Sequence, residues 1–293
     1  MIDDQQDATL FTLQAMRKQE EQCYQVSDYL SRLPADTCCR QAPVDAAARQ
    51  QIAKWCINIM QACNYQREYA AITMSFLDRF VSTSEGHSIL LDRHQYQLAA
   101  LTAIYTSVKI HCPQALSPDL VAKLSQGSFS RQDIEAMERR MLAALQWRVN
   151  PPTIMDFIRS YLDLIPETGL DEHSRNVVLD LAALQADTSV LDYKFVPHKA
   201  SHIAFGSLLN AVESVFGETN MDYLTDVSEI IQLATGIHGS ALSELRSQLY
   251  ECIIGQDGIE IPSSQKAAIH PPKKMRRESY VESPRSIMDH CHQ

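Results

Sequence analysis

The spacing of the apolar residues is the feature that most restricts the fold of this chain. They recur at intervals of three and four, as in Ile52, Cys56, Met60 and Cys63, so that each set forms one face of an α-helix. Only 9 of the 293 residues are glycine, which is few for a fold of short strands joined by tight turns. The sequence therefore predicts an all-α protein.

The same periodicity predicts an N-terminal helix over 8–32, which ends before Pro34, and then two sets of five helices. The first set is expected at 44–64, 67–83, 92–111, 117–125 and 130–145. The second set is expected at 153–164, 172–187, 198–216, 221–235 and 239–254. Residues 82–88 have the composition of a turn. Ser130 is expected to cap its helix, with Asp133 in the first turn.

Two consecutive prolines, Pro151 and Pro152, separate the two sets of helices. Proline lacks an N–H donor and restricts the preceding residue to extended conformations, so a domain boundary is expected there. The apolar period also stops near 255, where Gly, Pro, Ser and charged residues take over. The expected domains are an N-terminal helix and linker (1–43), a first repeat (44–150), a second repeat (151–254) and a disordered tail (255–293).

A formal net charge of −10 favours a protein partner over nucleic acid, because phosphate binding requires a basic surface. We expect no membrane span, since no run of 18 apolar residues is present. The eight cysteines have no regular spacing, and residues 1–4 do not resemble a secretory signal, so reduced thiols inside the cell are expected.

The sequence contains none of the common short motifs of enzymes or metal sites. There is no Gly-x4-Gly-Lys phosphate loop, no Gly-x-Ser-x-Gly nucleophile and no Cys-x2-Cys pair for zinc. The cluster His290-Cys291-His292 stands alone in the tail. We therefore expect a protein without catalytic residues, cofactor or metal.

Two charged residues fall on helix faces that should be buried. At 100° per residue, Arg49 lies within about 20° of Met60 on the apolar face. Asp78 lies on the helix expected over 67–83, which is apolar nearly all round. A buried, unpaired carboxylate would cost on the order of several kcal/mol. An Arg49–Asp78 ion pair would satisfy both groups; the equal alternative is that both reach solvent at helix ends.

Lys109 and Glu138 also border apolar faces. Lys109 follows Leu98 by eleven residues, about three helical turns, and so continues its apolar stripe. Glu138 follows Ile134 by four and precedes Leu142 by four. Such side chains usually extend to water along their apolar stems. The alternative is a polar pair at the centre of an apolar binding surface.

Four segments, in order, resemble the landmarks of the cyclin box. They are Arg49-x5-Trp55, Phe76-Leu77-Asp78-Arg79-Phe80, Thr106-Ser107-Val108-Lys109 and Met137-Glu138. Residues 145–157 resemble the exit of a cyclin's first repeat, and 186–197 more weakly resemble the beginning of the second. The chain is thus identified as a member of the cyclin family, whose usual architecture is two tandem five-helix repeats.

This resemblance implies a regulatory subunit that binds and activates a cyclin-dependent protein kinase and so controls cell-cycle progression. Activation requires no chemistry from a cyclin, because its rigid surface selects the active kinase conformation. The resemblance also implies that Arg49 and Asp78 form a structural ion pair. The implied kinase contacts are Lys109, Ile110, Glu138, Leu142 and Trp147. The alternative is a cyclin-fold adaptor or transcription-linked scaffold that activates no kinase.

Some cyclins hold Arg-x-Leu peptides of substrates or inhibitors in an apolar groove. The matching positions here are Ala48, Ile52, Trp55, Asn58 and Gln97. Trp55 and Gln97 fit this role, whereas Ala48 replaces a larger apolar residue and Asn58 an acidic one. The groove is therefore expected to be shallower and less attractive to arginine. The alternative is that Trp55 is only a core residue.

Subtype is left open by the sequence. Ile110-His111-Cys112 follow Lys109 where many cyclins have acidic residues. Trp147 resembles the D-type group, but no Leu-x-Cys-x-Glu segment is present near the N-terminus. Recruitment of pocket proteins by that segment is therefore not expected.

The tail contains short motifs for regulation. Ser279 follows Arg276-Arg277-Glu278, as in sites of basophilic kinases, and Ser283 precedes Pro284, as in sites of proline-directed kinases. Residues 273–277 resemble a nuclear import signal, although a merely solvated basic run is an equal interpretation. We expect phosphorylation at these serines and a location in nucleus and cytoplasm.

Overall fold

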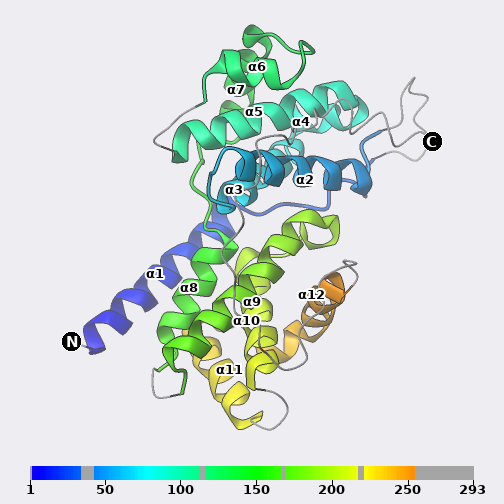
Figure 1. Cartoon of the computed structure of the whole chain (residues 1–293). Coiled ribbons are helices and arrows are strands. Elements are labelled where there is room, and N and C mark those ends of the chain that lie inside the picture. The colour runs from blue at the N-terminus through cyan, green and yellow to red at the C-terminus, as the bar shows by residue number, and fades with distance from the viewer. Residues whose placement is uncertain (1, 34–42, 113–115, 167–168, 217–220, 255–293) are drawn as a thin grey trace, which may run out of the picture.

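The computed structural model describes residues 2–33, 43–112, 116–166, 169–216 and 221–254 (Figure 1). Within these ranges the ordered elements are helices, and no strand is present. The expected all-α fold, with two tandem helical repeats after an N-terminal helix, is confirmed.

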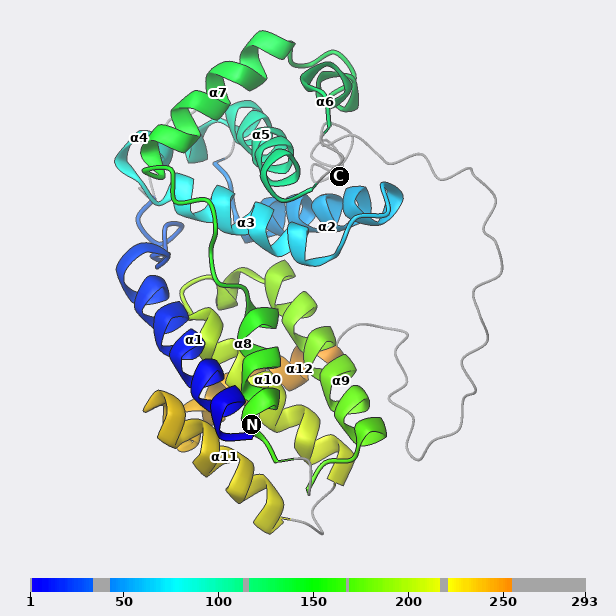
Figure 2. The same ribbon diagram turned by 90° about the vertical axis from the view of Figure 1, so that its left-hand side faces the viewer.

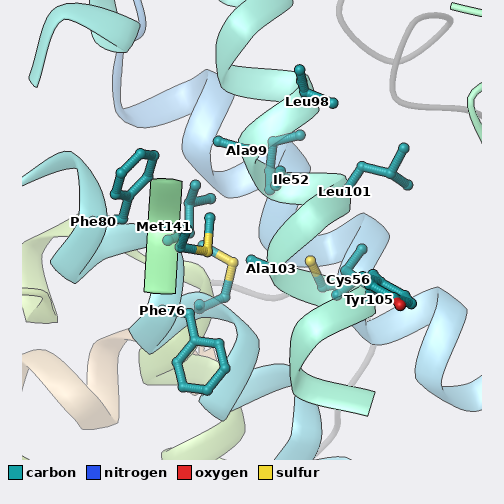
Figure 3. Packing of buried hydrophobic residues seen from close by; sticks show 14 of the residues in the cluster. Ile52, Cys56, Phe76, Phe80, Leu98, Ala99, Leu101, Ala103, Tyr105 and Met141 are labelled. Atoms are coloured by element: carbon teal, nitrogen blue, oxygen red, sulfur yellow. The ribbon is translucent and has the colours of Figure 1, made fainter. Parts of the chain in front are cut away.

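Two central helices, α3 and α5, organise the first repeat. The repeat consists of α2 (Ala46–Ala62), α3 (Glu68–Val81), α4 (Ser84–His87), the 3₁₀ helix η1 (Ser88–Leu91), α5 (Arg93–His111), α6 (Pro118–Leu124) and α7 (Arg131–Ala144). α3 and α7 pack against α5, and α2 packs against α3. Figure 3 shows side chains from these helices, among them Ile52, Phe76, Leu101 and Met141, meeting in one core.

The second repeat surrounds α10. It consists of α8 (Ile154–Leu164), α9 (Glu172–Leu191), the 3₁₀ helix η2 (Tyr193–Phe195), α10 (Ala200–Phe216), α11 (Met221–Thr235), the 3₁₀ helix η4 (Gly239–Leu242) and α12 (Ser243–Ile254). α10 contacts all four other α-helices of the repeat. Its burial follows from its composition, since it is apolar on most sides.

Local capping explains where several helices begin. Ser130 and Asp133 form a reciprocal capping box at the start of α7, which confirms the cap expected there. Thr153 and Asp156 form a second capping box at the start of α8, directly after the proline pair. Both boxes satisfy N–H groups that the first helical turn leaves without partners.

The N-terminal helix has different bounds from those expected. The helix α1 spans Ile2–Cys23 rather than 8–32. It ends early because the chain must extend to bury Tyr29, whose hydroxyl donates a hydrogen bond of 2.7 Å to Asp78 in the first repeat. α1 itself lies along α8 and α11, and Leu13 is buried in the second core (Figure 2).

Residues 82–88, expected as a turn, contain α4. The Thr83 hydroxyl caps this helix by accepting a hydrogen bond from the Gly86 amide. Gly86 lies so close to the end of α3 that an added Cβ would be 2.0 Å from the Phe80 carbonyl oxygen. The absence of a side chain at Gly86 therefore permits the sharp connection between α3 and η1.

Candidate functional site

A buried ion pair joins α2 to α3. Arg49 donates from Nε to Asp78 Oδ1 at 2.9 Å and from Nη2 to Oδ2 at 2.7 Å. Both residues are buried, at 2% and 5% exposed. A bidentate pair of this kind satisfies the carboxylate and most of the guanidinium, which is what burial of both charges requires.

The same pair reaches the second repeat. Arg49 Nη1 donates to the carbonyl oxygen of Val190, in the last turn of α9, at 3.0 Å. Burial tends to lower the pKa of Arg49, but the charge and hydrogen bonds of Asp78 outweigh burial and raise it. Burial raises the pKa of Tyr29, and the Asp78 carboxylate adds to this effect. Arg49 therefore stays a guanidinium cation, and Tyr29 stays a neutral phenol.

Lys109, near the end of α5, and Glu138, in the middle of α7, form a second pair. Lys109 Nζ lies 3.1 Å from each carboxylate oxygen of Glu138. The Lys109 side chain is 47% exposed and that of Glu138 only 10%. Burial tends to lower the pKa of Lys109, but hydrogen bonding and charge from Glu138 outweigh it and raise the pKa. Lys109 therefore presents a positive charge to solvent from a fixed position.

Apolar residues follow both members of this pair. Ile110 comes directly after Lys109, Leu142 lies one helical turn after Glu138, and the Trp147 amide bonds to the Leu142 carbonyl oxygen. Ile110 is 42% exposed and Trp147 is 70% exposed, whereas Leu142 is 7% exposed and mostly covered. Lys109 also lies over the ring of Tyr105, at 5.2 Å from its centroid. Large exposed apolar residues beside a half-buried charge pair are typical of protein-binding surfaces.

The backbone after α7 holds Trp147 outward. Trp147 N donates to Leu142 O at 2.9 Å and Gln146 N to Ala143 O at 3.0 Å, the hydrogen bonds of a Schellman motif. Gln146 and Trp147 have φ of 53° and 59°, in the left-handed region that favours glycine. This conformation costs about 1–2 kcal/mol per residue. Strain of this kind often marks a functional position.

Three other features are absent from the part of the chain that the structure describes: a cluster of metal ligands, a membrane-spanning helix and a disulfide. Within these ranges, no group of three or more His, Cys, Asp or Glu side chains is placed to hold a metal ion. None of the helices described is long and apolar enough to cross a membrane. The five cysteines that fall in the described ranges are all free.

Family comparison agrees with this architecture. A family model described as "Cyclin, N-terminal domain" matches residues 12–150, and one described as "Cyclin, C-terminal domain" matches residues 152–282. The chain belongs to the cyclin family. The cyclin is also similar to the X-ray structure of a viral cyclin from herpesvirus saimiri. That likeness has a TM-score of 0.57 and 17% identity, and covers 82% of this chain and 97% of the other, which shows the shared fold.

Curated relatives of this cyclin are distant in sequence. Human G1/S-specific cyclin-D1 is 24% identical over 203 residues, which are 69% of this chain and 64% of that protein. Human cyclin-O is 27% identical over 215 residues, which are 72% of this chain and 56% of that protein. The matched region thus spans less than two thirds of either relative.

The positions matching a peptide-docking groove are mostly buried in this cyclin. Ala48, Ile52 and Trp55 are each 1% exposed and belong to the first core. Gln97, on α5, is 7% exposed, and Asn58 is exposed on α2. The burial of Trp55 agrees with a core role, and peptide docking stays a prediction.

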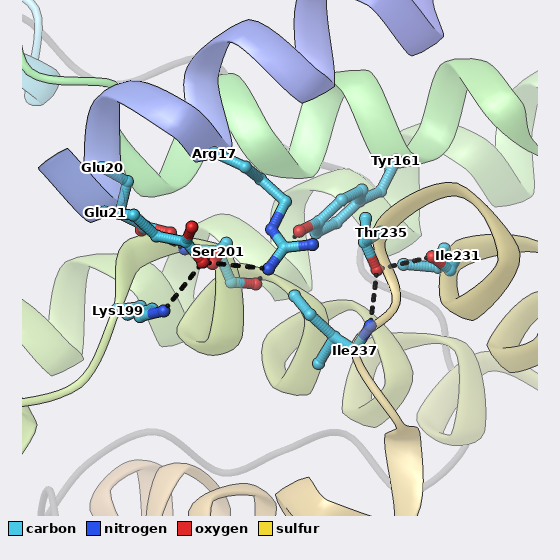
Figure 4. Close-up of polar contacts among 9 residues, drawn as sticks. All are labelled: Arg17, Glu20, Glu21, Tyr161, Lys199, Ser201, Ile231, Thr235 and Ile237. Atoms are coloured by element: carbon cyan, nitrogen blue, oxygen red, sulfur yellow. Dashed lines mark hydrogen bonds and ion pairs between the residues drawn. The ribbon is translucent and has the colours of Figure 1, made fainter.

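Sequence reasoning missed a buried carboxylate at the start of α10. Glu20, 4% exposed on α1, accepts hydrogen bonds from Ser201 N at 2.9 Å and Ser201 Oγ at 2.6 Å (Figure 4). Beside it, Lys199 Nζ lies 3.1 Å from Glu21 Oε1. The residue before α10 is Lys199, which cannot act as an N-cap acceptor. The lack of a capping side chain before α10 in the sequence therefore indicated that another segment supplies the cap.

The regulatory motifs of the tail lie outside the described residues. They are Ser279, Ser283 and the basic run 273–277. Phosphorylation, nuclear import and the expected disorder of 255–293 stay predictions.

Proposed function

We propose that this cyclin binds a cyclin-dependent protein kinase, activates it and so contributes to cell-cycle control as a non-catalytic regulatory subunit. The observation that carries the proposal is the Lys109–Glu138 pair beside the exposed side chains of Ile110 and Trp147. The family membership supports the same function. The proposed contacts are those that the resemblance implied, with Leu142 lying beneath the surface rather than on it.

The geometry suits recognition by a protein surface. Glu138 holds Lys109 Nζ through both carboxylate oxygens, and the Lys109 side chain stays 47% exposed to a partner. Glu138 keeps Lys109 in place, so little side-chain entropy is lost on binding. Trp147 supplies a large apolar side chain of the type that dominates binding energy at interfaces.

Activation follows from selection of one kinase conformation. A rigid helical surface that binds the active arrangement more tightly than the inactive one shifts the population toward the active state. The Lys–Glu pair and the metal-binding Asp that perform phosphoryl transfer belong to the kinase. The cyclin contributes shape and charge alone.

The test is co-expression with candidate cyclin-dependent kinases of the host, followed by purification and an assay of histone phosphorylation. We expect the wild type to activate a kinase. Lys109→Glu and Glu138→Lys should each lose kinase binding, and circular dichroism should show that both stay helical. Arg175→Glu is a matched control, because Arg175 pairs with Asp163 at 2.8 Å within the second repeat.

A double variant separates binding from folding. Lys109→Glu with Glu138→Lys restores an ion pair of opposite orientation, so it should regain stability but not kinase binding. Activation unaffected by any of these reversals would contradict the site. A chain that purifies without any kinase would instead favour a cyclin-fold adaptor.

A further inference from the structure

A hollow of about 450 Å³ lies where α1, α3 and α7 end. Arg79 and Arg148 line it, together with uncharged polar residues that include Gln25, Ser27 and Gln146. Among its described lining residues none is acidic. In a chain with a net charge of −10, two arginines without a carboxylate form an isolated positive site.

Arg79 is a buried cation with incomplete compensation. The residue is 5% exposed, its Nη2 donates to the carbonyl oxygen of Arg148 at 2.9 Å, and its guanidinium lies 4.6 Å from the ring centroid of Tyr24. Its Nη1 is buried without a hydrogen-bond partner in the described part of the chain. Burial, with a smaller effect from the charge of Arg148, lowers the pKa of Arg79 to about 10, so it stays protonated at neutral pH.

Arg148 brings a second guanidinium to the same hollow. It is exposed, and its Nη1 contacts the Cys23 sulfur, which is a weak hydrogen-bond acceptor. Carbonyl groups at the helix ends attract cations and account for the bond from Arg79 to the Arg148 carbonyl. That bond occupies only Nη2 of Arg79, so Nη1 stays buried without an acceptor among the described residues. Leaving an N–H of a charged group in this state is costly.

We propose that this hollow binds a phosphate group, either free or carried on a phosphorylated serine or threonine of another protein. A phosphate carries a charge of about −1.5 to −2 and three or more acceptor oxygens, enough to bridge two guanidiniums. A single carboxylate would leave one positive charge without compensation. Gln146 and Arg148 flank Trp147, so the bound phosphate would lie beside the proposed partner surface.

The test uses the full chain alone, so its outcome does not depend on kinase activation. Isothermal titration would compare inorganic phosphate, a peptide with one phosphoserine, and the same peptide unphosphorylated. Arg148→Gln should weaken phosphate binding about tenfold or more, as loss of a hydrogen bond between charged groups predicts. Arg139→Gln, which removes an exposed charge of α7 outside the hollow, should leave binding unchanged.

Phosphopeptide binding much tighter than that of phosphate would identify a modified protein as the source, and similar affinities would identify the free anion. Arg79→Gln should also abolish binding; if that variant fails to fold, Arg148→Gln still provides the test. The proposal is overturned if neither phosphate ligand binds the wild type. It is also overturned if Arg148→Gln and Arg139→Gln bind alike.

Discussion

Arg49 Nη1 donates to the carbonyl oxygen of Val190 at 3.0 Å, and this bond joins the first repeat of the cyclin to the second. The same guanidinium holds Asp78 through its other nitrogens. Asp78 in turn accepts from Tyr29, in the segment that leaves α1. One buried ion pair thus fixes three parts of the chain, so its loss should loosen the junction as well as the first core.

Removing one partner of this pair should destabilise the protein strongly. Arg49→Met leaves the Asp78 carboxylate buried without its cation, and the free energy of unfolding should fall by about 3–5 kcal/mol, measured by urea denaturation. Arg67→Met is the control. Arg67 pairs with Asp187 at 3.0 Å but its side chain is 59% exposed, so the change should be about 1 kcal/mol or less. Equal losses of stability in the two variants would show that the buried pair contributes no more than an exposed one.

Trp147→Ala should separate binding from stability. Because Trp147 is 70% exposed, its truncation should change the free energy of unfolding by only about 0.5 kcal/mol. Affinity for the kinase should fall by about 2 kcal/mol or more, a Kd increase of tens of fold, measured by surface plasmon resonance. Leu233→Ala removes another exposed apolar side chain, on α11 of the second repeat, and should leave affinity unchanged. A similar loss of affinity in both variants would argue against a contact between Trp147 and the kinase.

Glu20 should give stability an unusual pH dependence. Burial raises the pKa of Glu20 above 4.5, although hydrogen bonds from Ser201 act in the opposite direction. The folded state therefore holds this proton more tightly than the unfolded state. Its contribution is most favourable at or below pH 4.5 and declines as pH rises through the folded pKa. Relative to Glu20→Gln, the wild type should lose stability as pH rises from 4.5, measured by urea denaturation at each pH.

Glu21 provides the control of opposite sign. The hydrogen bond and charge of Lys199 lower the pKa of Glu21, so its contribution is present above pH 4.5 and is lost as pH falls through the folded pKa. Glu21→Gln should therefore show a small difference from wild type that shrinks at acid pH. If the free energies of unfolding of wild type and Glu20→Gln changed with pH in parallel, Glu20 would have the same pKa in the folded and unfolded states.

Gln146→Gly should stabilise the end of α7. Glycine adopts the φ of 53° found at Gln146 without the strain of a side chain. Glycine also increases the backbone entropy of the unfolded chain, which offsets part of this gain. The free energy of unfolding should therefore rise by up to about 1 kcal/mol. Ala136→Gly, at an exposed position in the middle of the same helix, should instead lower it by about 1 kcal/mol. Destabilisation by both would contradict the role of the left-handed turn.

Prediction from sequence succeeded where the signal is local. Ile52, Cys56 and Met60 lie one helical turn apart, and their side chains are buried on one face of α2. Ser130 caps α7 because its partner, Asp133, is three residues away. Prediction failed at the end of α1, because that end depends on burying Tyr29 against Asp78. These two residues are 49 positions apart in the sequence.

The candidate surface was also only partly visible in the sequence. Periodicity placed Lys109 and Glu138 at the edges of apolar faces, but left open whether each reaches water or they meet. Packing of α5 against α7 decides this, because it brings their side chains within 3.1 Å and leaves Lys109 half exposed. The outward position of Trp147 depends on left-handed backbone angles at residues other than glycine, which the composition of the turn does not indicate.

The sequence by itself therefore determined most of the helices, their order and the family, since helix formation and capping depend on residues within a few positions of each other. Apart from the Arg49–Asp78 pair, which the cyclin resemblance implied, only the tertiary structure decided how buried charges are compensated. Glu20 meets Ser201 across 181 positions, Arg49 meets Val190 across 141, and Arg79 shares its hollow with Arg148. Such contacts have no local signal, because they exist only once the two repeats and α1 have packed together.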